Sequence, residues 1–225
     1  REKILPEYKA NRGSPPEGFS EQLEWVKKLT EALGYFSFEM EGLEADDLIA
    51  SAVRQKKASS RDLIIVSADK DLAQLVDSGV QQLLPPPTAN PKIGWRTLDP
   101  SSVKEKFGVP PNRILDYLSI IGDQSDNIPG IAGVGPKTAV KWLTEYKNLE
   151  GLIQNAGRVT PKRFCSAIYE NRERLMMNRE LIRLEEEIEF EIPEPRQVDL
   201  QILKEILGEM EMTKSWEEAQ KRYTK

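Results

Sequence analysis

Seven acidic residues gather in three short stretches of the sequence: Glu44, Asp46 and Asp47, then Asp69 and Asp71, then Asp123 and Asp126. The 225 residues include no histidine and one cysteine, so any metal ion must be bound by oxygen. Hard oxygen ligands suit Mg²⁺ or Mn²⁺, which commonly pair in phosphoryl-transfer sites. Two such ions about 4 Å apart can activate water for attack at phosphorus without any histidine. The acids therefore predict phosphodiester hydrolysis.

Each acidic stretch also has a purely structural explanation. Carboxylates in the first turn of a helix are stabilised by its dipole, and they cap its free N–H groups. Several carboxylates that converge on one crevice, however, cannot all stay ionised without cations. The convergence of the three stretches, more than any single stretch, favours a metal site.

The elements around these acids predict a βαβ pattern in the first hundred residues. We expect a helix capped by Ser20 and running to Leu33, a strand at residues 35–40, and a helix over residues 42–55. Residues 63–66 are continuously apolar, which is typical of a strand buried on both faces of a parallel sheet. A short helix from Asp71 and a strand at residues 80–84 should follow. Ligands of such sheets bind beyond the carboxyl ends of the strands, where Asp69 and Asp71 lie.

From residue 99 onward the sequence predicts short helices. DPSSVKEKFG begins with Asp99 as the cap and proline at the first helical position, and PPNRILDYLSIIG repeats the proline-led start. The acidic segment EEEIEFEIPEP is interpreted as a solvated edge strand or an extended connector. We therefore divide the chain into an α/β domain, residues 1–98, and a helical region, residues 99–225.

The glycine-rich stretch GIAGVGPKT has three interpretations. A nucleotide-binding P-loop needs Lys directly after the last glycine, but Pro136 intervenes and no buried strand precedes. A helix-hairpin-helix turn fits better, with helices at residues 111–121 and from Thr138. Gly133 and Gly135 would then let the backbone approach a phosphate, with Lys137 and the helix start adding positive charge. Such contacts grip a nucleic-acid backbone without reading bases. A helix–helix turn that is glycine-rich for local reasons is the third interpretation.

Composition sets further bounds. The formal net charge of −5 argues against a polyanionic partner, but setting the seven candidate ligands aside leaves 30 acidic against 32 basic residues. No apolar run approaches the roughly 20 residues of a membrane span, and no leader opens the chain, so we expect an intracellular protein with no membrane contact. Cys165 is interpreted as a small buried hydrophobe, since no histidine could activate it.

Four motifs resemble the 5′ nuclease (flap endonuclease) family, and the likeness runs in order over nearly the whole chain. They are YKANR at residues 8–12, GLEADD at 42–47, SADKDLAQLV at 67–76, and GDQSDNIPGIAGVGPKTA at 122–139. The branch they are most similar to includes the 5′-3′ exonuclease domain of bacterial DNA polymerase I. The resemblance implies a PIN-like α/β fold whose mostly parallel sheet is flanked by helices, followed by the helical region.

The resemblance also assigns roles. It places Glu44, Asp46 and Asp47 at one metal and Asp69, Asp71, Asp123 and Asp126 toward a second, with Asp46 among the catalytic residues. YKANR begins the family's helical arch, in which Lys9 contacts the scissile phosphate, Arg12 assists, and Tyr8 stacks on a base. Read alone, YKANR is simply a basic loop. Arg1 is similar to the Arg of a Phe-Arg pair that follows two further acidic ligands and the first strands, so we expect a fragment without them.

The function implied is a 5′-3′ exonuclease and flap endonuclease that uses two Mg²⁺ or Mn²⁺ ions in replication and repair. Gly133, Gly135, Lys137 and Thr138 would hold duplex DNA with a 5′ flap or 5′ end, with a monovalent cation at the turn. We expect a monomer with a fused or separate DNA polymerase, in the bacterial cytoplasm and nucleoid, or in an organelle if the source is eukaryotic. The alternatives are a DNA-binding module without catalysis, favoured by the missing ligands, and a single-strand RNA nuclease.

Overall fold

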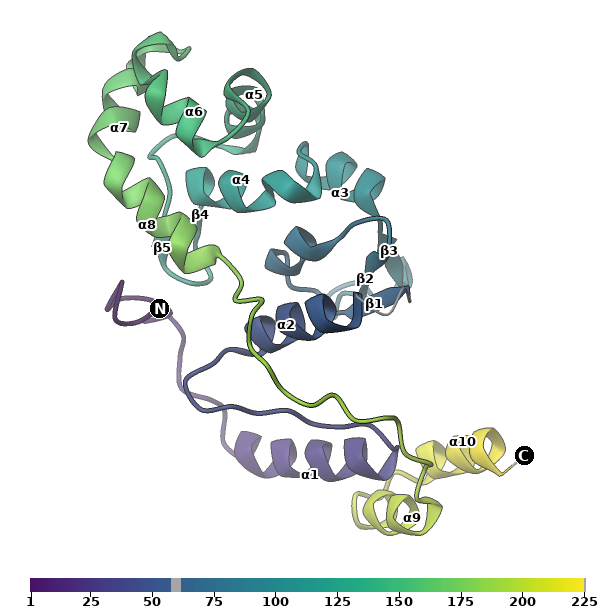
Figure 1. Ribbon diagram of the computed structural model, residues 1–225. Helices are drawn as coiled ribbons and strands as arrows, with labels where there is room; N and C mark the ends of the chain where they lie inside the picture. The colour runs from purple at the N-terminus through teal and green to yellow at the C-terminus, as the bar shows by residue number, and fades with distance from the viewer. Residues whose placement is uncertain (58–61, 225) are drawn as a thin grey trace. The chain divides into compact units, whose positions relative to one another are not determined.

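The computed structural model describes residues 1–57 and 62–224, which form two compact units (Figure 1). Unit 1 comprises residues 1–12 and 45–188, and unit 2 comprises residues 13–44 and 189–225. Each unit is therefore built from two separate stretches of the chain. Unit 1 contains residues from both sides of the expected boundary between residues 98 and 99. The division of the chain into an α/β domain and a helical region stays a prediction.

Unit 1 contains a three-stranded sheet in the order β1-β2-β3, formed by Leu63–Val66, Val80–Leu84 and Arg96–Leu98. β1 and β2 are parallel, whereas β3 runs antiparallel to β2. The sheet of the described residues is therefore mixed, whereas a mostly parallel sheet was expected. The loop that joins β2 to β3 contains a single 3-10 turn, η2 (Pro91–Ile93). Because it includes no crossover helix, β3 can pair with β2 only in the antiparallel direction.

Strand β1 is buried on one face only, in contrast to the expectation that both faces are covered. Ile64 and Val66 are 63% and 60% exposed, whereas Ile65 on the opposite face is 6% exposed. Ile65 packs in a small core with Ala50 of α2 (Ala45–Lys57) and Leu72. A continuous apolar run therefore did not distinguish a strand covered on both faces from one covered on a single face.

Helices make up most of the rest of unit 1, and Figure 1 shows α5 to α8 gathered at the end of the unit away from the sheet. The elements are η1 (Asp71–Leu75), α3 (Pro100–Phe107), η3 (Pro111–Arg113), α4 (Ile114–Ile121), α5 (Pro136–Tyr146), α6 (Leu149–Gln154), η4 (Ala156–Arg158), η5 (Lys162–Phe164), α7 (Cys165–Glu170) and α8 (Arg172–Ile182). Asp99 caps α3 as predicted, accepting a hydrogen bond from the N–H of Ser102 at 2.7 Å. α4 packs against α5 and α8 around fully buried Leu118 and Trp142.

The stretch GDQSDNIPG contains a strand pair that the sequence analysis did not predict. β4 (Gly122–Asp123) pairs antiparallel with β5 (Ile128–Pro129) directly after α4. Gly122 has φ 77°, and a Cβ at this position would lie 2.3 Å from the backbone nitrogen of Gly130. Only glycine fits both the backbone conformation and this close approach. The result is a tight hairpin that carries Asp123 and Asp126.

Unit 2 contains α1 (Phe19–Ala32), α9 (Leu200–Glu209) and α10 (Thr213–Tyr223), with a small core around Leu203 and Ile206. α1 begins one residue before the expected cap, with Gly18 at the N-cap position. The strand expected at residues 35–40 does not form. A strand needs a neighbour for its backbone hydrogen bonds, and the described part of unit 2 provides only helices and irregular segments.

Residues 185–195 form no helix or strand, which agrees with the connector interpretation of the acidic segment. Among the described residues, no helix combines the length and apolar character that crossing a membrane requires.

Candidate metal centre

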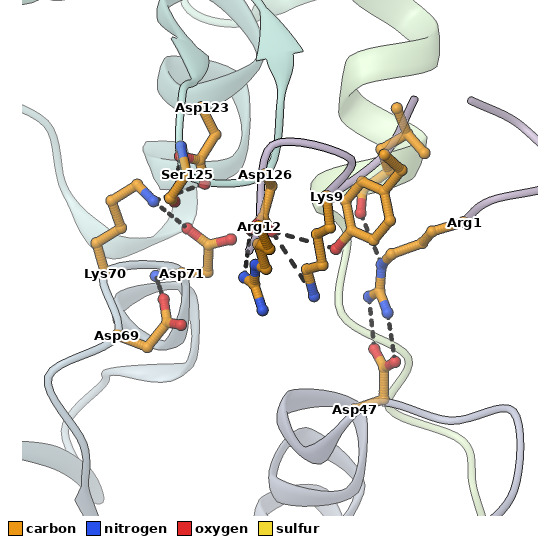
Figure 2. A network of polar contacts seen from close by, with 12 residues as sticks. Arg1, Lys9, Arg12, Asp47, Asp69, Lys70, Asp71, Asp123, Ser125 and Asp126 are labelled. Carbon is orange, nitrogen blue, oxygen red and sulfur yellow. Dashed lines mark hydrogen bonds and ion pairs between the residues drawn. The ribbon is translucent and has the colours of Figure 1, made fainter. Parts of the chain in front are cut away.

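Asp71, Asp123 and Asp126 form a carboxylate cluster, in which one ligand atom from each residue lies within 4.8 Å of the others. Asp71 opens η1, shortly after β1, and Asp123 and Asp126 come from the hairpin of β4 and β5 (Figure 2). These are three of the seven acids predicted to bind metal. Their convergence joins two of the three predicted acidic stretches, which are about 50 residues apart in the chain.

The electrostatics of the carboxylate cluster favour a bound cation. Burial, and then the charges of Asp69, Asp123 and Asp126, raise the pKa of Asp71 to about 7, although the ammonium of Lys70 opposes this. Oδ1 of Asp71 is buried and accepts no hydrogen bond from the described residues. Three carboxylates with an oxygen that no donor satisfies are a donor set that fits a hard divalent cation.

Lys70 places a positive charge at the edge of the carboxylate cluster. Its Nζ donates a hydrogen bond to Oδ2 of Asp123 at 2.6 Å and lies 3.5 Å from Oδ1 of Asp71. Burial disfavours the charged ammonium, but the hydrogen bond to Asp123 and the charge of Asp71 outweigh it and raise the pKa of Lys70. Against the opposing effect of burial, Lys70 and then Ser125 lower the pKa of Asp123. Asp123 therefore stays ionised at neutral pH.

A buried amide fixes the turn that carries Asp69 and Asp71. Gln82 of β2 is fully buried, and its Nε2 donates to the carbonyl oxygens of Ser67 at 3.0 Å and Asp69 at 2.6 Å. Oδ1 of Asp69 in turn accepts the N–H of Asp71 at 2.9 Å. Asp69 therefore lies beside the carboxylate cluster and shapes the turn into η1.

A second buried amide fixes the hairpin that carries Asp123 and Asp126. Nδ2 of Asn178 in α8 donates to the carbonyl oxygens of Ser119 at 3.1 Å and Pro129 at 2.8 Å, and Asn178 is fully buried. These bonds join α8 to the end of α4 and to β5. The position of the hairpin acids thus depends on a residue about 50 positions further along the chain.

The YKANR segment lies against Asp126 (Figure 2). Arg12 forms an ion pair with Oδ1 of Asp126 at 2.6 Å, Tyr8 donates its hydroxyl to Oδ2 at 3.1 Å, and Nζ of Lys9 lies 3.9 Å from Oδ2. The backbone N–H of Lys9 also donates to the carbonyl oxygen of Asp126 at 3.0 Å. Tyr8 is 7% exposed, and Lys9 stands 4.8 Å from its ring centre. Two basic side chains therefore stand beside the carboxylate cluster.

The first acidic stretch lies outside the carboxylate cluster. Asp47 is 3% exposed and is bonded to the guanidinium of Arg1, and Asp46 shares the first turn of α2 with it. Glu44 belongs to unit 2. The metal-binding roles of these three acids and of Asp69 remain proposals.

The glycine turn leads into α5 two residues earlier than expected, because the helix begins at Pro136 rather than Thr138. Gly133 has φ 75°, and Gly135 occupies the N-cap position of α5 with extended backbone. A Cβ on Gly135 would meet no atom within 4 Å, and Lys137 is exposed beside it. The start of α5 is therefore open to a ligand at the position where a phosphate would bind.

Two family comparisons cover most of the chain. Residues 1–108 match the 5′-3′ exonuclease, N-terminal resolvase-like domain, and residues 109–205 match the 5′-3′ exonuclease, C-terminal SAM fold. The chain belongs to the 5′-3′ exonuclease family.

Curated members of the 5′-3′ exonuclease family with similar sequences are bacterial DNA polymerases. The chain is 36% identical to the thermostable DNA polymerase I of Thermus filiformis over 215 residues, covering 94% of this chain and 25% of the polymerase. It is 37% identical to DNA polymerase I of Rhizobium leguminosarum over 192 residues, covering 85% of this chain and 18% of the polymerase. The chain thus spans a quarter or less of these relatives, and the expected relation to DNA polymerase I is confirmed.

Solved structures share the α/β fold of this exonuclease-family chain. The bacteriophage T5 flap endonuclease, crystallised with DNA and metal ions, gives a TM-score of 0.68 at 22% identity, covering 93% of this chain and 79% of the phage protein. The catalytic core of Rad2, in complex with DNA substrate, gives a TM-score of 0.61 at 14% identity, covering 92% and 67%. At sequence identities of 22% and 14%, the similarity to these two structures shows a shared fold.

Four residues that shape the carboxylate cluster were not predicted from the sequence, namely Lys70, Gln82, Ser125 and Asn178. Gln82 carried a weak signal, because it alternates in phase with the apolar residues Val80 and Leu84 of the same strand. Lys70 and Ser125 sit between acids in SADKD and GDQSD, which is where a counter-charge or a turn hydroxyl would be sought. Asn178 carried no signal, because its partners are set by the packing of α8 against α4.

Proposed function

We propose that this chain is a divalent-metal-dependent nuclease with 5′-3′ exonuclease and structure-specific 5′-flap endonuclease activity on DNA, serving replication and repair. The observation that carries the proposal is the carboxylate cluster of Asp71, Asp123 and Asp126 with Lys9 and Arg12 beside it. A phosphodiester held there would meet carboxylates that can bind metal and cations that can bind phosphate oxygens.

Two Mg²⁺ or Mn²⁺ ions would be held by Asp71, Asp123 and Asp126 together with Asp46 and Asp69, whereas the carboxylate of Asp47 is already bonded to Arg1. When bound, such ions lower the pKa of a water molecule and stabilise negative charge on the transferring phosphoryl group. Lys9 and Arg12 would bind the scissile phosphate. To do so, Arg12 would exchange its ion pair with Asp126 for the phosphate, which the exposed position of its side chain permits.

The helix-hairpin-helix turn would hold duplex DNA through its backbone. Gly133 and Gly135 permit close approach, Lys137 supplies charge, and Thr138 lies in the first turn of α5. These contacts predict binding that is insensitive to base sequence and weakens steeply with salt. A monovalent cation at this turn is part of the same proposal. The phage T5 and Rad2 proteins of similar fold were crystallised with DNA, which supports a DNA partner.

The relatives are bacterial DNA polymerases, which supports a bacterial source and a function as part of, or beside, a DNA polymerase. For this chain we propose a location in the bacterial cytoplasm and nucleoid. We expect the chain to act as a monomer on a 5′ flap or 5′ end.

The test is cleavage of an end-labelled 5′-flap DNA by the chain, with Mg²⁺ or Mn²⁺ and with a chelator. We expect cutting near the flap junction that needs the metal and that Asp71→Asn reduces at least about a hundredfold, as for loss of a central transition-state contact. Asp77→Asn is the matched control, since Asp77 pairs with Lys57 outside the carboxylate cluster.

Other outcomes separate the alternatives. Salt-dependent binding of the flap DNA without any metal-dependent cutting would support the DNA-binding module. Preferential binding and cutting of a single-stranded RNA of equal length would support the RNA nuclease instead.

A further inference from the structure

The two oxygens of Asp123 both accept hydrogen bonds from neighbouring residues. Oδ1 accepts hydrogen bonds from the N–H of Ser125 at 3.0 Å and from its hydroxyl at 2.6 Å, and Oδ2 accepts the ammonium of Lys70 at 2.6 Å. Asp123 is 6% exposed, so the described protein side chains, more than bulk water, determine its environment.

We propose that Lys70 is a resident counter-cation of the carboxylate cluster, whose ammonium must leave Asp123 before a divalent ion can take this carboxylate as a ligand. The inference rests on the proposed metal site and specifies how the free protein prepares it. An ammonium and a divalent ion on the same carboxylate oxygen would repel each other strongly at this short range. A divalent ion on Oδ2 of Asp123 and the Lys70 hydrogen bond to that oxygen therefore exclude each other, and Oδ1 already accepts two hydrogen bonds from Ser125.

The side chain of Lys70 is suited to such an exchange. It is 35% exposed, so its ammonium can move into solvent, and its flexible stem can swing away without moving the backbone. Asp71 lies 3.5 Å away through Oδ1, the buried oxygen that accepts no hydrogen bond from the described residues. Lys70 thus compensates the charge of Asp71 without satisfying that oxygen, which stays available to a metal ion.

The proposal has two consequences for the free protein. Without metal, the ammonium offsets repulsion among three clustered carboxylates and stabilises the fold. With metal, the displaced ammonium subtracts from the binding free energy, so the cluster binds a divalent ion more weakly than the same carboxylates would without Lys70.

The experiment is calorimetric titration of the whole chain with Mn²⁺, for the unmodified protein and for Lys70→Gln, Lys70→Arg and Lys57→Gln. We expect Lys70→Gln to bind Mn²⁺ about tenfold more tightly or more, because the metal ion no longer has to break the attraction between the ammonium of Lys70 and the carboxylate of Asp123. Lys70→Arg keeps the charge, so its affinity should not exceed that of the unmodified chain. Lys57→Gln removes the lysine of a similar lysine–aspartate pair outside the carboxylate cluster, and should leave the affinity unchanged.

Thermal unfolding in a chelator provides the second measurement. Lys70→Gln should unfold at a lower temperature than the unmodified chain in chelator, and the difference should shrink in saturating Mn²⁺. If the unmodified chain bound Mn²⁺ and Lys70→Gln bound it equally or more weakly, the counter-cation role of Lys70 would be wrong. The proposed metal site would still stand. If neither protein bound Mn²⁺ or Mg²⁺, the proposed metal site would be wrong and the counter-cation with it.

Discussion

The guanidinium of Arg1 binds both carboxylate oxygens of Asp47, at 2.6 and 2.7 Å. The N–H of Glu185 donates to the same carboxylate at 3.0 Å, and Nε of Arg1 donates to the carbonyl oxygen of Leu181 at 2.8 Å. Asp47 therefore joins the start of the chain, the first turn of α2 and the segment after α8 within unit 1. The resemblance to the 5′ nuclease family implied that Asp47 is a metal ligand. These contacts instead give its carboxylate a structural role that needs no metal.

Replacing Asp47 by alanine should lower the free energy of unfolding by about 3–5 kcal/mol, because it leaves the largely buried guanidinium of Arg1 without its anionic partner and the N–H of Glu185 without its acceptor. The loss should be the same in chelator and in Mg²⁺, measured by urea denaturation. Asp77→Ala, at a more exposed ion pair, should cost about 0–1 kcal/mol. If Asp47→Ala weakened metal binding and left stability in chelator intact, Asp47 would be a ligand and the structural role would be wrong.

Gln82→Met should reduce both stability and metal affinity. The thioether fills a similar volume but cannot donate, so the carbonyl oxygens of Ser67 and Asp69 lose their partner at a cost of about 1–3 kcal/mol. The turn that carries Asp71 then becomes less ordered, which should appear as weaker Mn²⁺ binding in calorimetry.

Gln81→Met is the matched control for this substitution, because Gln81 is the exposed neighbour on the same strand. It should change neither stability nor metal binding measurably. Equal effects of the two substitutions would show that the buried hydrogen bonds of Gln82 do not position Asp71.

Gly135→Ala should weaken duplex DNA binding about tenfold, the loss of one charge-assisted hydrogen bond, and leave stability unchanged. The structure has open space for the added methyl group and an extended backbone that alanine adopts, so the methyl group would obstruct only an approaching ligand. Fluorescence anisotropy with a labelled duplex measures the affinity.

Gly208→Ala, in α9 of unit 2, adds a methyl group in similarly open space and should leave DNA affinity unchanged. Unaltered DNA binding by Gly135→Ala would remove the glycine turn from the DNA interface. Gly130→Ala is unsuitable for this comparison, because its Cβ would lie 2.2 Å from the backbone of Ile121.

Asp99 should make the stability of unit 1 depend on pH in acid. The N–H of Ser102, then the hydroxyls of Ser101 and Ser102, lower the pKa of Asp99 from 3.8 to about 2. A carboxyl group whose pKa is lower in the folded state stabilises the fold above its unfolded pKa. Its contribution should be present above pH 3.8 and should be lost as the pH falls toward about 2.

Asp99→Asn keeps an acceptor at the cap but cannot titrate. The difference in unfolding free energy between the unmodified chain and this variant should therefore shrink between pH 3.8 and about 2, measured by urea denaturation at each pH. A difference that stays constant over this range would show that the charge of Asp99 does not stabilise α3.

Local chemistry accounts for the parts of the fold that were predicted correctly. The cap of α3 by Asp99, the strands at residues 63–66 and 80–84, and the short helix at Asp71 each depend on a few adjacent residues. The strand predicted at residues 35–40 failed because β propensity does not supply a partner strand. The burial predicted for both faces of β1 failed for a related reason, since a strand's own sequence does not specify what covers it.

The sequence by itself determined that this chain holds oxygen ligands suited to a hard cation, that they lie at the ends of secondary-structure elements, and that its motifs belong to the 5′-3′ exonuclease family. Only the tertiary structure decided which acids meet. Asp71 joins Asp123 and Asp126, whereas Asp47 pairs with Arg1. The physical reason is that caps and turns are fixed by neighbours within a few residues. The partners of a buried charge instead depend on how elements that are far apart in the chain pack together.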